Sequence, residues 1–433
     1  MKKWMLFLLT IPLLLTGCSS IEAPASPSAE DSSPAPGDYS AEPDASTQPG
    51  DFRAESEAPT QPGFGDAITQ SVDGMGVGKF SNIRIADKFG KWPEQTGEPY
   101  YTSQVGMWYT LWWTGEGTKT YNFWWAWTGL KPVEFGYYSS GDRDYLATNL
   151  QYFNNIGIDY LILDDTNEHF YVLYNGAIDA NMRACYEVAA ALDGKSPQIA
   201  IATGGPIRRP DVGGQQAELD LYYEEFVTKY PGVHFSWQGK PLVLMYYGGS
   251  TWAFSTFIAD SRFTIRTGTG KTSWGTNASV INDDYGNWGW VYDRQWPGSE
   301  VYGVQAGYMA SAGTVSREDG QRYIREWLAA IEENPQTIII PSWNDHAEYT
   351  SIEPAQWWPN FEDPFFYEKV TEGYLALRYG LIEGFYYRAK SSAEIYKYSG
   401  AELVLFNEIP SYTEPVILVP DDYFDWLGVK IVK

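Results

Sequence analysis

Residues 338–354 read IIIPSWNDHAEYTSIEP. The three isoleucines at 338–340 have the composition of a buried parallel strand, and the run ends abruptly at Pro341. Polar and aromatic side chains follow at once: Trp343, Asn344, Asp345, His346 and Glu348. In a β/α barrel, the side chains that do chemistry lie at the C-terminal ends of the strands. The stretch therefore predicts a strand of such a barrel with a functional site at its end.

The chain before this stretch alternates between short apolar runs and segments with helical spacing. The apolar runs predict eight strands, at residues 105–113, 133–138, 158–163, 198–203, 241–247, 263–267, 301–306 and 338–340. Helices are predicted at residues 146–156, 181–192, 217–229, 251–260, 318–332 and 366–379. Crossovers of this length imply parallel pairing, and there is no glycine-rich dinucleotide fingerprint. We expect an α/β fold, a (β/α)8 TIM barrel.

The N-terminal segment is typical of an exported protein. Lys2 and Lys3 precede an apolar stretch at 4–15, which is a secretory signal pattern and is shorter than the roughly 20 residues of a membrane span. Residues 15–18, LTGC, resemble a bacterial lipobox. The resemblance implies a signal peptide at 1–17, lipidation of Cys18 and a lipid anchor at the cell surface or cell envelope.

The remaining boundaries follow from changes in composition. Residues 18–76 are rich in Ser, Pro, Ala and Glu and predict a disordered tether, since they carry little apolar surface to bury. The barrel domain is expected at 77–384. Alternating apolar residues beyond it predict a small β-rich appendage at 385–433.

Composition narrows the class of partner. The net charge of −25 argues against nucleic acid or an anionic membrane surface as a partner. Aromatic residues make up 17% of the chain, with 19 Trp and 33 Tyr, and such side chains stack on sugar rings and donate hydrogen bonds to hydroxyls. Three scattered His and no Cys cluster give no transition-metal spacing. We expect a monomer that binds a carbohydrate and needs no cofactor or metal.

Asp345 and Glu348 are the candidate catalytic pair. If the segment becomes helical after the strand, a spacing of three residues places both carboxyl groups on one face. Glycoside hydrolysis uses two carboxyl groups about 5 to 5.5 Å apart for retention or about 6.5 to 9.5 Å apart for inversion. Burial and like charge would push their pKa values apart, as one acid and one base require. The same spacing also fits a solvated helix start.

Further residues at predicted strand ends are candidates for substrate binding. They are Trp108, Tyr109, Trp113, Asp164, Asp165, Tyr246, Trp343, Asn344 and His346. Asp164 and Asp165 suit hydrogen bonds to sugar hydroxyls or, alternatively, a structural cap. Asp142 is expected to cap the helix that follows it. Asp283 and Asp284, in a loop rich in Gly and Trp, are candidates for contact with substrate or calcium.

The string SWNDHAEYTSIEP resembles the S-W-N-E-W-x-E-x-T-x-I-E-P signature of glycoside hydrolase families 99 and 71. The matching positions are Ser342, Trp343, Asn344, Glu348, Thr350, Ile352, Glu353 and Pro354. Residues 136–142, GYYSSGD, resemble the G-x-Y-x-S-x-D segment of the same families. With Trp108-Tyr109, residues 157–159 and residues 239–241, the likeness spans residues 105 to about 354.

The resemblance implies a hydrolase that cuts α-linked mannan, glucan or N-glycan chains. It makes Glu348 the general acid/base and Asp345 the carboxylate that acts on the sugar 2-hydroxyl or as a base. The family pattern has Glu where this chain has Asp345, and a misplacement of about 1 Å can cost 10²-fold in rate. Retention through a 1,2-anhydro intermediate and inversion through a water both remain open. The rival hypothesis is a surface lipoprotein that binds glycans on a degenerate barrel without cleaving them.

Overall fold

The computed structural model describes residues 88–113, 130–166, 177–204, 212–247, 259–269, 288–289, 299–310, 313–356, 363–408, 410 and 414–433. All of them belong to one compact unit. The predicted signal peptide, Cys18 and the tether at 18–76 lie outside these residues. Within the described ranges, no helix combines the length and the apolar character that crossing a membrane requires.

The main sheet has eight strands. They are β1 (Gln104–Thr110), β2 (Tyr160–Asp165), β3 (Gln198–Thr203), β4 (Ser236–Trp237), β5 (Lys240–Tyr247), β6 (Thr264–Thr269), β7 (Val301–Gly303) and β10 (Thr337–Ile340). The parallel strands follow the order β6-β5-β3-β2-β1-β10-β7, and the short β4 pairs antiparallel with β5. The first strand of the chain therefore lies between β2 and the last strand of the sheet, with Met107 opposite Ile340 and Thr110 opposite Asp164.

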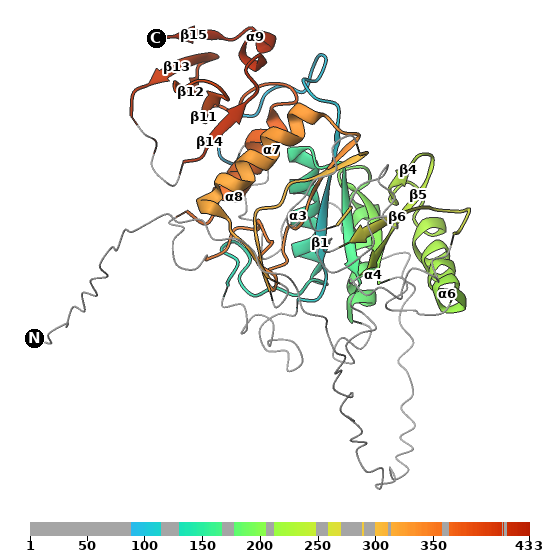
Figure 1. Ribbon diagram of the computed structural model, residues 1–433. Helices are drawn as coiled ribbons and strands as arrows, with labels where there is room; N and C mark the ends of the chain where they lie inside the picture. Colours follow the sequence, from blue (N-terminus) through green and yellow to red (C-terminus); the bar gives the residue numbers. More distant parts are fainter. Residues whose placement is uncertain are drawn as a thin grey trace, which may run out of the picture. The chain divides into compact units, whose positions relative to one another are not determined.

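Helices follow most of the parallel strands (Figure 1). They are α3 (Arg143–Ile156), α4 (Ala177–Ala191), α6 (Val212–Tyr222) with a π-helix at Tyr223–Thr228, α7 (Gln321–Glu333) after a 3-10 turn at Glu318–Gly320, and α8 (Phe366–Ala376). Asp142 caps α3 as predicted, because its carboxylate accepts the N–H groups of Asp144 and Tyr145. Gly157, with φ +86°, ends the same helix. A hairpin of β8 (Tyr308–Ala310) and β9 (Gly313–Val315) precedes α7.

The strand predicted at 133–138 is wrong. These residues form a turn with one isolated bridge, between Pro132 and Ala355, and β1 pairs directly with β2. Gly136 has φ +64°, which breaks an extended run. Tyr138 stacks on Tyr145 of α3, with ring centroids 3.8 Å apart. The apolar residues of the segment are therefore used to pack on a helix. The helix predicted at 251–260 falls almost entirely outside the described residues.

Side chains on the two faces of the parallel sheet form two separate cores. The inner core includes Trp108, Tyr160, Ile162, Leu244 and Ile339. The outer core includes Met107, Tyr109, Leu161 and Leu163, together with the helices. Successive residues of each strand thus enter different cores, as alternation requires. Both faces are buried, which explains why the strands read as continuous apolar runs.

Within the described residues, β6 and β7 are not paired with each other, so the structure shows a curled parallel sheet rather than the eight paired strands of the expected (β/α)8 barrel. Side chains bridge the two strands instead. Arg266 of β6 forms a buried ion pair with Glu300, which directly precedes β7. The carboxylate of Glu300 also accepts the indole N–H groups of Trp237 and Trp288, at 3.2 and 3.0 Å.

A second sheet follows near the C-terminus, where a β-rich appendage was expected. Its strands are β11 (Tyr386–Ala389), β12 (Ile395–Ser399), β13 (Glu402–Phe406), β14 (Val416–Val419) and β15 (Lys430–Val432), in the order β14-β11-β12-β13-β15, with α9 (Tyr423–Leu427) before the last strand. The Tyr423 hydroxyl donates to the carbonyl oxygens of Leu377 and Gly380, each at 3.0 Å. A Cβ at Gly373 would meet Ile417 at 2.8 Å, so glycine lets α8 and β14 approach closely.

Candidate active site

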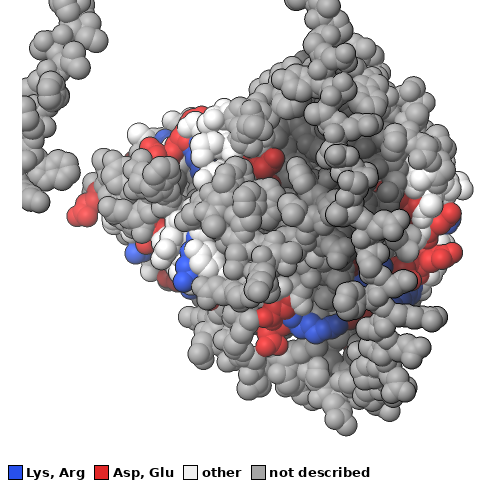
Figure 2. All heavy atoms as spheres, turned by 90° about the horizontal axis from the view of Figure 1, so that it is seen from below, with Lys and Arg blue, Asp and Glu red and all other residues white. Residues whose placement is uncertain are grey.

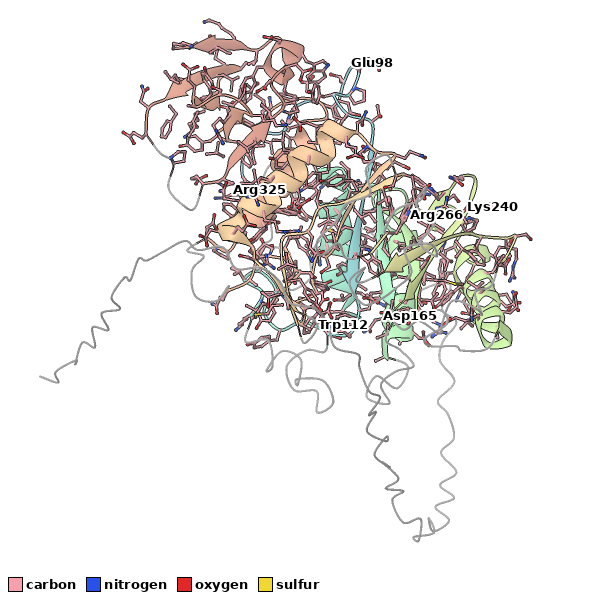
Figure 3. The ribbon with its side chains drawn as sticks, in the orientation of Figure 1. Glu98, Trp112, Asp165, Lys240, Arg266 and Arg325 are labelled. Carbon is pink, nitrogen blue, oxygen red and sulfur yellow. The ribbon has the colours of Figure 1, made fainter. Side chains whose placement is uncertain are left out.

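The C-terminal ends of the strands point to one side of the sheet. Figure 3 places Asp165, at the end of β2, and Trp112, just after β1, at the lower side, and Lys240, at the start of β5, at the upper side. Figure 2 views the molecule from that lower side. There the visible acidic and basic side chains of the described residues are interspersed, with no extended basic surface among them. The loop that carries the candidate pair leaves β10 toward the same side, because β10 runs parallel to β1.

Asp345 and Glu348 lie on one tight turn after β10, and the expected helix start is not formed. Asp345 Oδ1 accepts the backbone N–H of Glu348 at 3.0 Å. The Asp345 carbonyl accepts the N–H groups of Thr350 and Ser351, at 3.2 and 3.3 Å. Tyr349 has φ +55°, which turns the chain back. The two acids are therefore neighbours in space by a turn rather than by helical spacing.

The two acids differ in exposure. Asp345 is 1% exposed, whereas Glu348 is partly exposed. Burial raises the pKa of Asp345 well above its usual value, and the charge of Glu348 raises it further. Burial and the charge of Asp164 raise the pKa of Glu348 to about 7. The pair thus retains a proton near neutral pH.

Few groups neutralise these acids. Asp345 Oδ2 is buried without a hydrogen-bond partner among the described residues. Likewise, no described Lys or Arg forms an ion pair with Asp345 or Glu348, and none of the described side chains donates to the Glu348 carboxyl. A buried carboxyl oxygen without a donor is costly, and such groups are rare in structural positions. The turn therefore has hydrogen-bonding capacity that the described residues leave unmet.

Asp164 and Asp165, adjacent at the end of β2, face opposite sides of the sheet. Asp164 follows the inner-core residues Tyr160 and Ile162 at alternate positions, and its charge reaches both Asp345 and Glu348. Its Oδ1 accepts the N–H and the hydroxyl of Thr166, at 2.9 and 2.7 Å. Asp165 accepts the hydroxyl of Tyr222 on α6. Only Asp164 is thus brought to the candidate pair.

The aromatic candidates lie in the two cores. Trp108 belongs to the inner core and donates its indole N–H to the Trp288 carbonyl at 2.9 Å. Tyr109 belongs to the outer core, where its hydroxyl accepts Asn149 Nδ2 at 3.3 Å. Trp343 packs edge-on against Phe153 of α3, with centroids 4.9 Å apart. All three are at most 2% exposed, so in this structure they pack in the cores and do not form an open surface for a substrate.

Asn344 and Trp113 connect the turn to the end of β1. Asn344 Oδ1 accepts the Thr110 N–H at 2.8 Å, and Asn344 Nδ2 donates to the Thr110 carbonyl at 3.0 Å. Trp113 donates its indole N–H to the Asn344 carbonyl at 2.9 Å. Both side chains are fully buried. These hydrogen bonds hold the turn against the end of β1, and neither side chain has an exposed surface near the candidate pair.

His346 belongs to a buried network that sequence reasoning did not identify. One ring nitrogen pairs with Glu353 Oε2 at 2.8 Å and the other with Ser351 Oγ at 2.9 Å. Glu353 also accepts the hydroxyls of Tyr138 and Tyr145, at 2.9 and 3.2 Å. With both ring nitrogens engaged, His346 has no free nitrogen for a sugar hydroxyl. A signal for Glu353 and Tyr138 was present, because both fall in the segments that resemble the glycoside hydrolase motifs.

Two further contacts fix the turn from outside. Arg317 Nη2 donates to the carbonyls of Tyr349 and Ser351, at 2.6 and 2.8 Å, and its guanidinium lies over the ring of Tyr367. The Met309 N–H donates to the Glu348 carbonyl at 2.9 Å. The backbone on both sides of Glu348 is thus held, which pre-organises the position of its carboxyl group.

Several predicted residues cannot be placed. Asp283 and Asp284 lie outside the described residues, and Tyr246 lies in β5 with its side chain outside them. Among the residues that the structure does describe, no group of three or more His, Cys, Asp or Glu could hold a metal ion.

No protein-family model matches the chain, and no curated protein matches it. Among solved structures, the chain is similar to the GH99 endo-alpha-mannosidase from Bacteroides thetaiotaomicron, with 15% identity, a TM-score of 0.47, and coverage of 63% of this chain and 96% of that chain. The same enzyme in complex with Bis-Tris-propane gives 16% identity, a TM-score of 0.45, and coverage of 64% and 95%. A glycoside hydrolase-like protein gives 11% identity, a TM-score of 0.38, and coverage of 61% and 89%. Similarity at this level does not by itself assign an activity.

Proposed function

We propose that the protein is a glycoside hydrolase in which Glu348 donates the proton and Asp345 is its partner. The observation that carries this proposal is the turn after β10. It holds two adjacent carboxyl groups without a neutralising cation among the described residues, and burial with the nearby Asp164 raises the pKa of Glu348 to about 7. A carboxyl group with a pKa near the working pH is suited to general acid catalysis. The likeness of 342–354 to the signature of families 99 and 71 supports the same assignment.

Glu348 is the better donor of the two because the residue is partly exposed, whereas Asp345 is buried. Protonated Glu348 would give its proton to the glycosidic oxygen as the bond to the anomeric carbon breaks. Asp345 holds the backbone of Glu348 through Oδ1 and leaves Oδ2 for a second acceptor role. When ionised, Oδ2 would take a proton from a water or from the sugar 2-hydroxyl. Asp164 would then bind a sugar hydroxyl beside them.

The substrate class follows from the resemblance, which implies α-linked mannan, glucan or N-glycan chains. The two candidate routes differ in product. Attack by a water that Asp345 deprotonates inverts the anomeric carbon, whereas attack by the sugar 2-hydroxyl followed by water retains it. NMR of the first-formed reducing end distinguishes them before the sugar mutarotates.

The test is hydrolysis by the domain without its N-terminal 76 residues. The protein is incubated with α-mannans, α-glucans and N-glycans, and new reducing ends are measured for the wild type and for Glu348→Gln. Product from the wild type alone supports the proposal. Binding without product from either protein would favour a glycan-binding lipoprotein and would overturn the hydrolase.

We also propose that the protein is exported and anchored through a lipidated Cys18, on the strength of the lipobox-like residues 15–18. Metabolic labelling with a fatty acid, followed by detergent partitioning, should show a lipidated wild type and an unlabelled Cys18→Ala variant. Equal labelling of the two proteins would rule the anchor out.

A further inference from the structure

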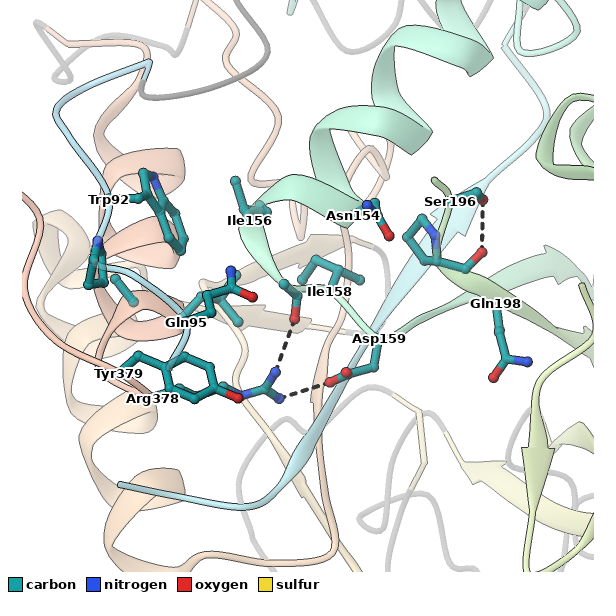
Figure 4. Close-up of a pocket in the computed structure, with 15 residues that line it drawn as sticks. Trp92, Gln95, Asn154, Ile156, Ile158, Asp159, Ser196, Gln198, Arg378 and Tyr379 are labelled. Atoms are coloured by element: carbon teal, nitrogen blue, oxygen red, sulfur yellow. Dashed lines mark hydrogen bonds and ion pairs between the residues drawn. The ribbon is translucent and has the colours of Figure 1, made fainter. Parts of the chain in front are cut away.

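A pocket of about 320 Å³ lies at the end of the parallel sheet opposite to the candidate active site. It is lined by the C-terminal end of α3, by residues just before β2 and β3, by the segment at 92–95 and by the end of α8 (Figure 4). Its volume falls at the lower end of the roughly 300–1,000 Å³ that small-molecule sites occupy. Nothing in the proposed hydrolysis uses this pocket.

The charged groups of the pocket neutralise one another. Arg378 Nη2 pairs with Asp159 Oδ2 at 2.8 Å, and the same guanidinium donates to the carbonyls of Gly157 and Ser103, at 3.3 and 2.5 Å. Figure 4 shows this pair between the side of the pocket formed by Tyr379 and Gln95 and the side formed by Asn154 and Ser196. With one cation and one anion paired, the pocket offers no excess charge. That balance disfavours a phosphate or an ammonium ligand.

Several polar groups of the pocket have unused hydrogen-bonding capacity. Within the described residues, the side-chain amides of Gln95 and Asn154 and the hydroxyl of Tyr379 form no hydrogen bond. Arg378 Nε is buried and likewise has no acceptor among these residues. The two amides and the hydroxyl can together donate to and accept from several neighbouring hydroxyl groups.

Apolar surface completes the wall. The apolar lining residues include Trp92, Pro93, Tyr379, Ile156 and Ile158. Ring and aliphatic faces of this kind match the C–H face of a pyranose, while the amides match its hydroxyls. We propose that this pocket is a second binding site, remote from the candidate active site, for a neutral polyhydroxylated ligand of the size of one or two sugar units.

The test uses full-length Glu348→Gln protein, in which turnover at the candidate active site is suppressed. Binding of methyl α-D-mannopyranoside and methyl α-D-glucopyranoside is followed by saturation-transfer NMR and calorimetry, with inorganic phosphate and choline as charged probes. The pocket variant adds Asn154→Ala and Tyr379→Phe. The matched control adds Gln151→Ala, which removes an amide from the same helix outside the pocket.

We expect one of the neutral glycosides to bind with a Kd on the order of millimolar, and the pocket variant to raise that Kd at least about tenfold through two lost hydrogen bonds. The Gln151→Ala control should leave it unchanged. Three results would each overturn the proposal: no binding of either glycoside, an unchanged Kd in the pocket variant when both variants melt as the parent does, or tighter binding of phosphate or choline. Because the assay measures binding in a protein that does not turn over, a failure of the proposed hydrolysis leaves its outcome unaffected.

Discussion

Two groups of buried carboxyl groups in this protein have opposite surroundings. In the first, Lys88 Nζ lies 2.9 and 2.8 Å from the two carboxyl oxygens of Glu368 and 2.6 Å from Glu134. Glu372, one turn along α8, accepts the hydroxyl of Tyr152 at 2.7 Å and the indole N–H of Trp92 at 3.0 Å. In the second, after β10, Asp345 Oδ2 and the Glu348 carboxyl have no donor among the described residues.

A shifted pKa alone does not separate the two groups. Burial raises the pKa of Glu368 to about 8 and that of Glu372 to about 7, as far as the pKa of Glu348 is raised. The two groups differ in whether their carboxyl oxygens accept hydrogen bonds from other residues. Every carboxyl oxygen of Glu368 and Glu372 has a donor within the protein, so these acids hold the structure together. The acids after β10 have carboxyl oxygens without a donor among the described residues, which is expected of a binding or catalytic site.

The largest expected effect is on turnover. Glu348→Gln removes the transferable proton and should lower kcat on an α-linked glycan by about 10²–10⁴-fold, the usual contribution of a general acid. Glu368→Gln, at a carboxyl whose pKa is raised at least as far, should leave kcat unchanged. Equal losses of kcat in the two variants, measured on proteins with native circular dichroism, would contradict the assignment of the two groups to different roles.

The next effect is on stability. Lys88→Met leaves Glu134 and Glu368 without their cation and should lower the free energy of unfolding by about 3 kcal/mol at about pH 9, where Glu368 is largely ionised. Urea denaturation measures the change. The loss should shrink as pH falls through about 8, because the pKa of Glu368 is raised to about 8 and the group is neutral below it. A loss that stays constant with pH would mean that Lys88 acts through packing on Phe89 and Phe365 instead.

Asp345→Asn tests the same comparison at the acids after β10. The amide keeps the Oδ1 contact to the Glu348 N–H but removes a buried charge beside a like charge. We expect the free energy of unfolding to rise by about 1 kcal/mol while kcat falls, which is the usual exchange of stability for function at a site. A variant that is both less stable and fully active would contradict the role of Asp345 as partner.

The smallest effect is a shift of the pH profile. Glu348 is active when protonated, and its pKa is raised to about 7, so kcat/KM should fall as pH rises through about 7. Asp164→Asn removes one cause of that raised pKa and keeps the oxygen that accepts from Thr166, so the fall should begin at a lower pH. A fall that lies well above pH 7 in the wild type would contradict the role of Glu348 as the proton donor.

Seven of the eight predicted strands appear in the structure, because runs such as 338–340 and 160–163 are apolar at every position. A strand that is apolar throughout does not show which side chains lie on which face of the sheet, because residues on both faces are apolar. In the sequence, Asp164 and Asp165 were therefore equivalent candidates, and so were Trp108 and Tyr109. Only the fold shows that Asp164 lies near the pair and that Tyr109 packs on α3.

The candidate turn was located from the sequence, but its geometry was not. The spacing of Asp345 and Glu348 favoured a helix start, whereas long-range contacts impose a turn: Arg317 on one side, Asn344 and Thr110 on the other. Local propensity carries no information about partners more than 30 residues away. For the same reason the sequence could not identify Arg317, although it could have ranked Glu353 higher from the motif that contains it.

The place of β10 between β1 and β7 has a consequence for biosynthesis. Gln104 and Thr337, which face each other, are separated by 233 positions in the chain. At a translation rate of about 5–20 residues per second, one edge of β1 remains without its partner β10 for on the order of 10–50 s during synthesis. An open strand edge invites pairing with other chains, so the nascent protein is prone to mispairing until β10 has been made. A chain terminated before residue 337 would lack both the closing strand and the acids that follow it, and premature release would yield an inert product.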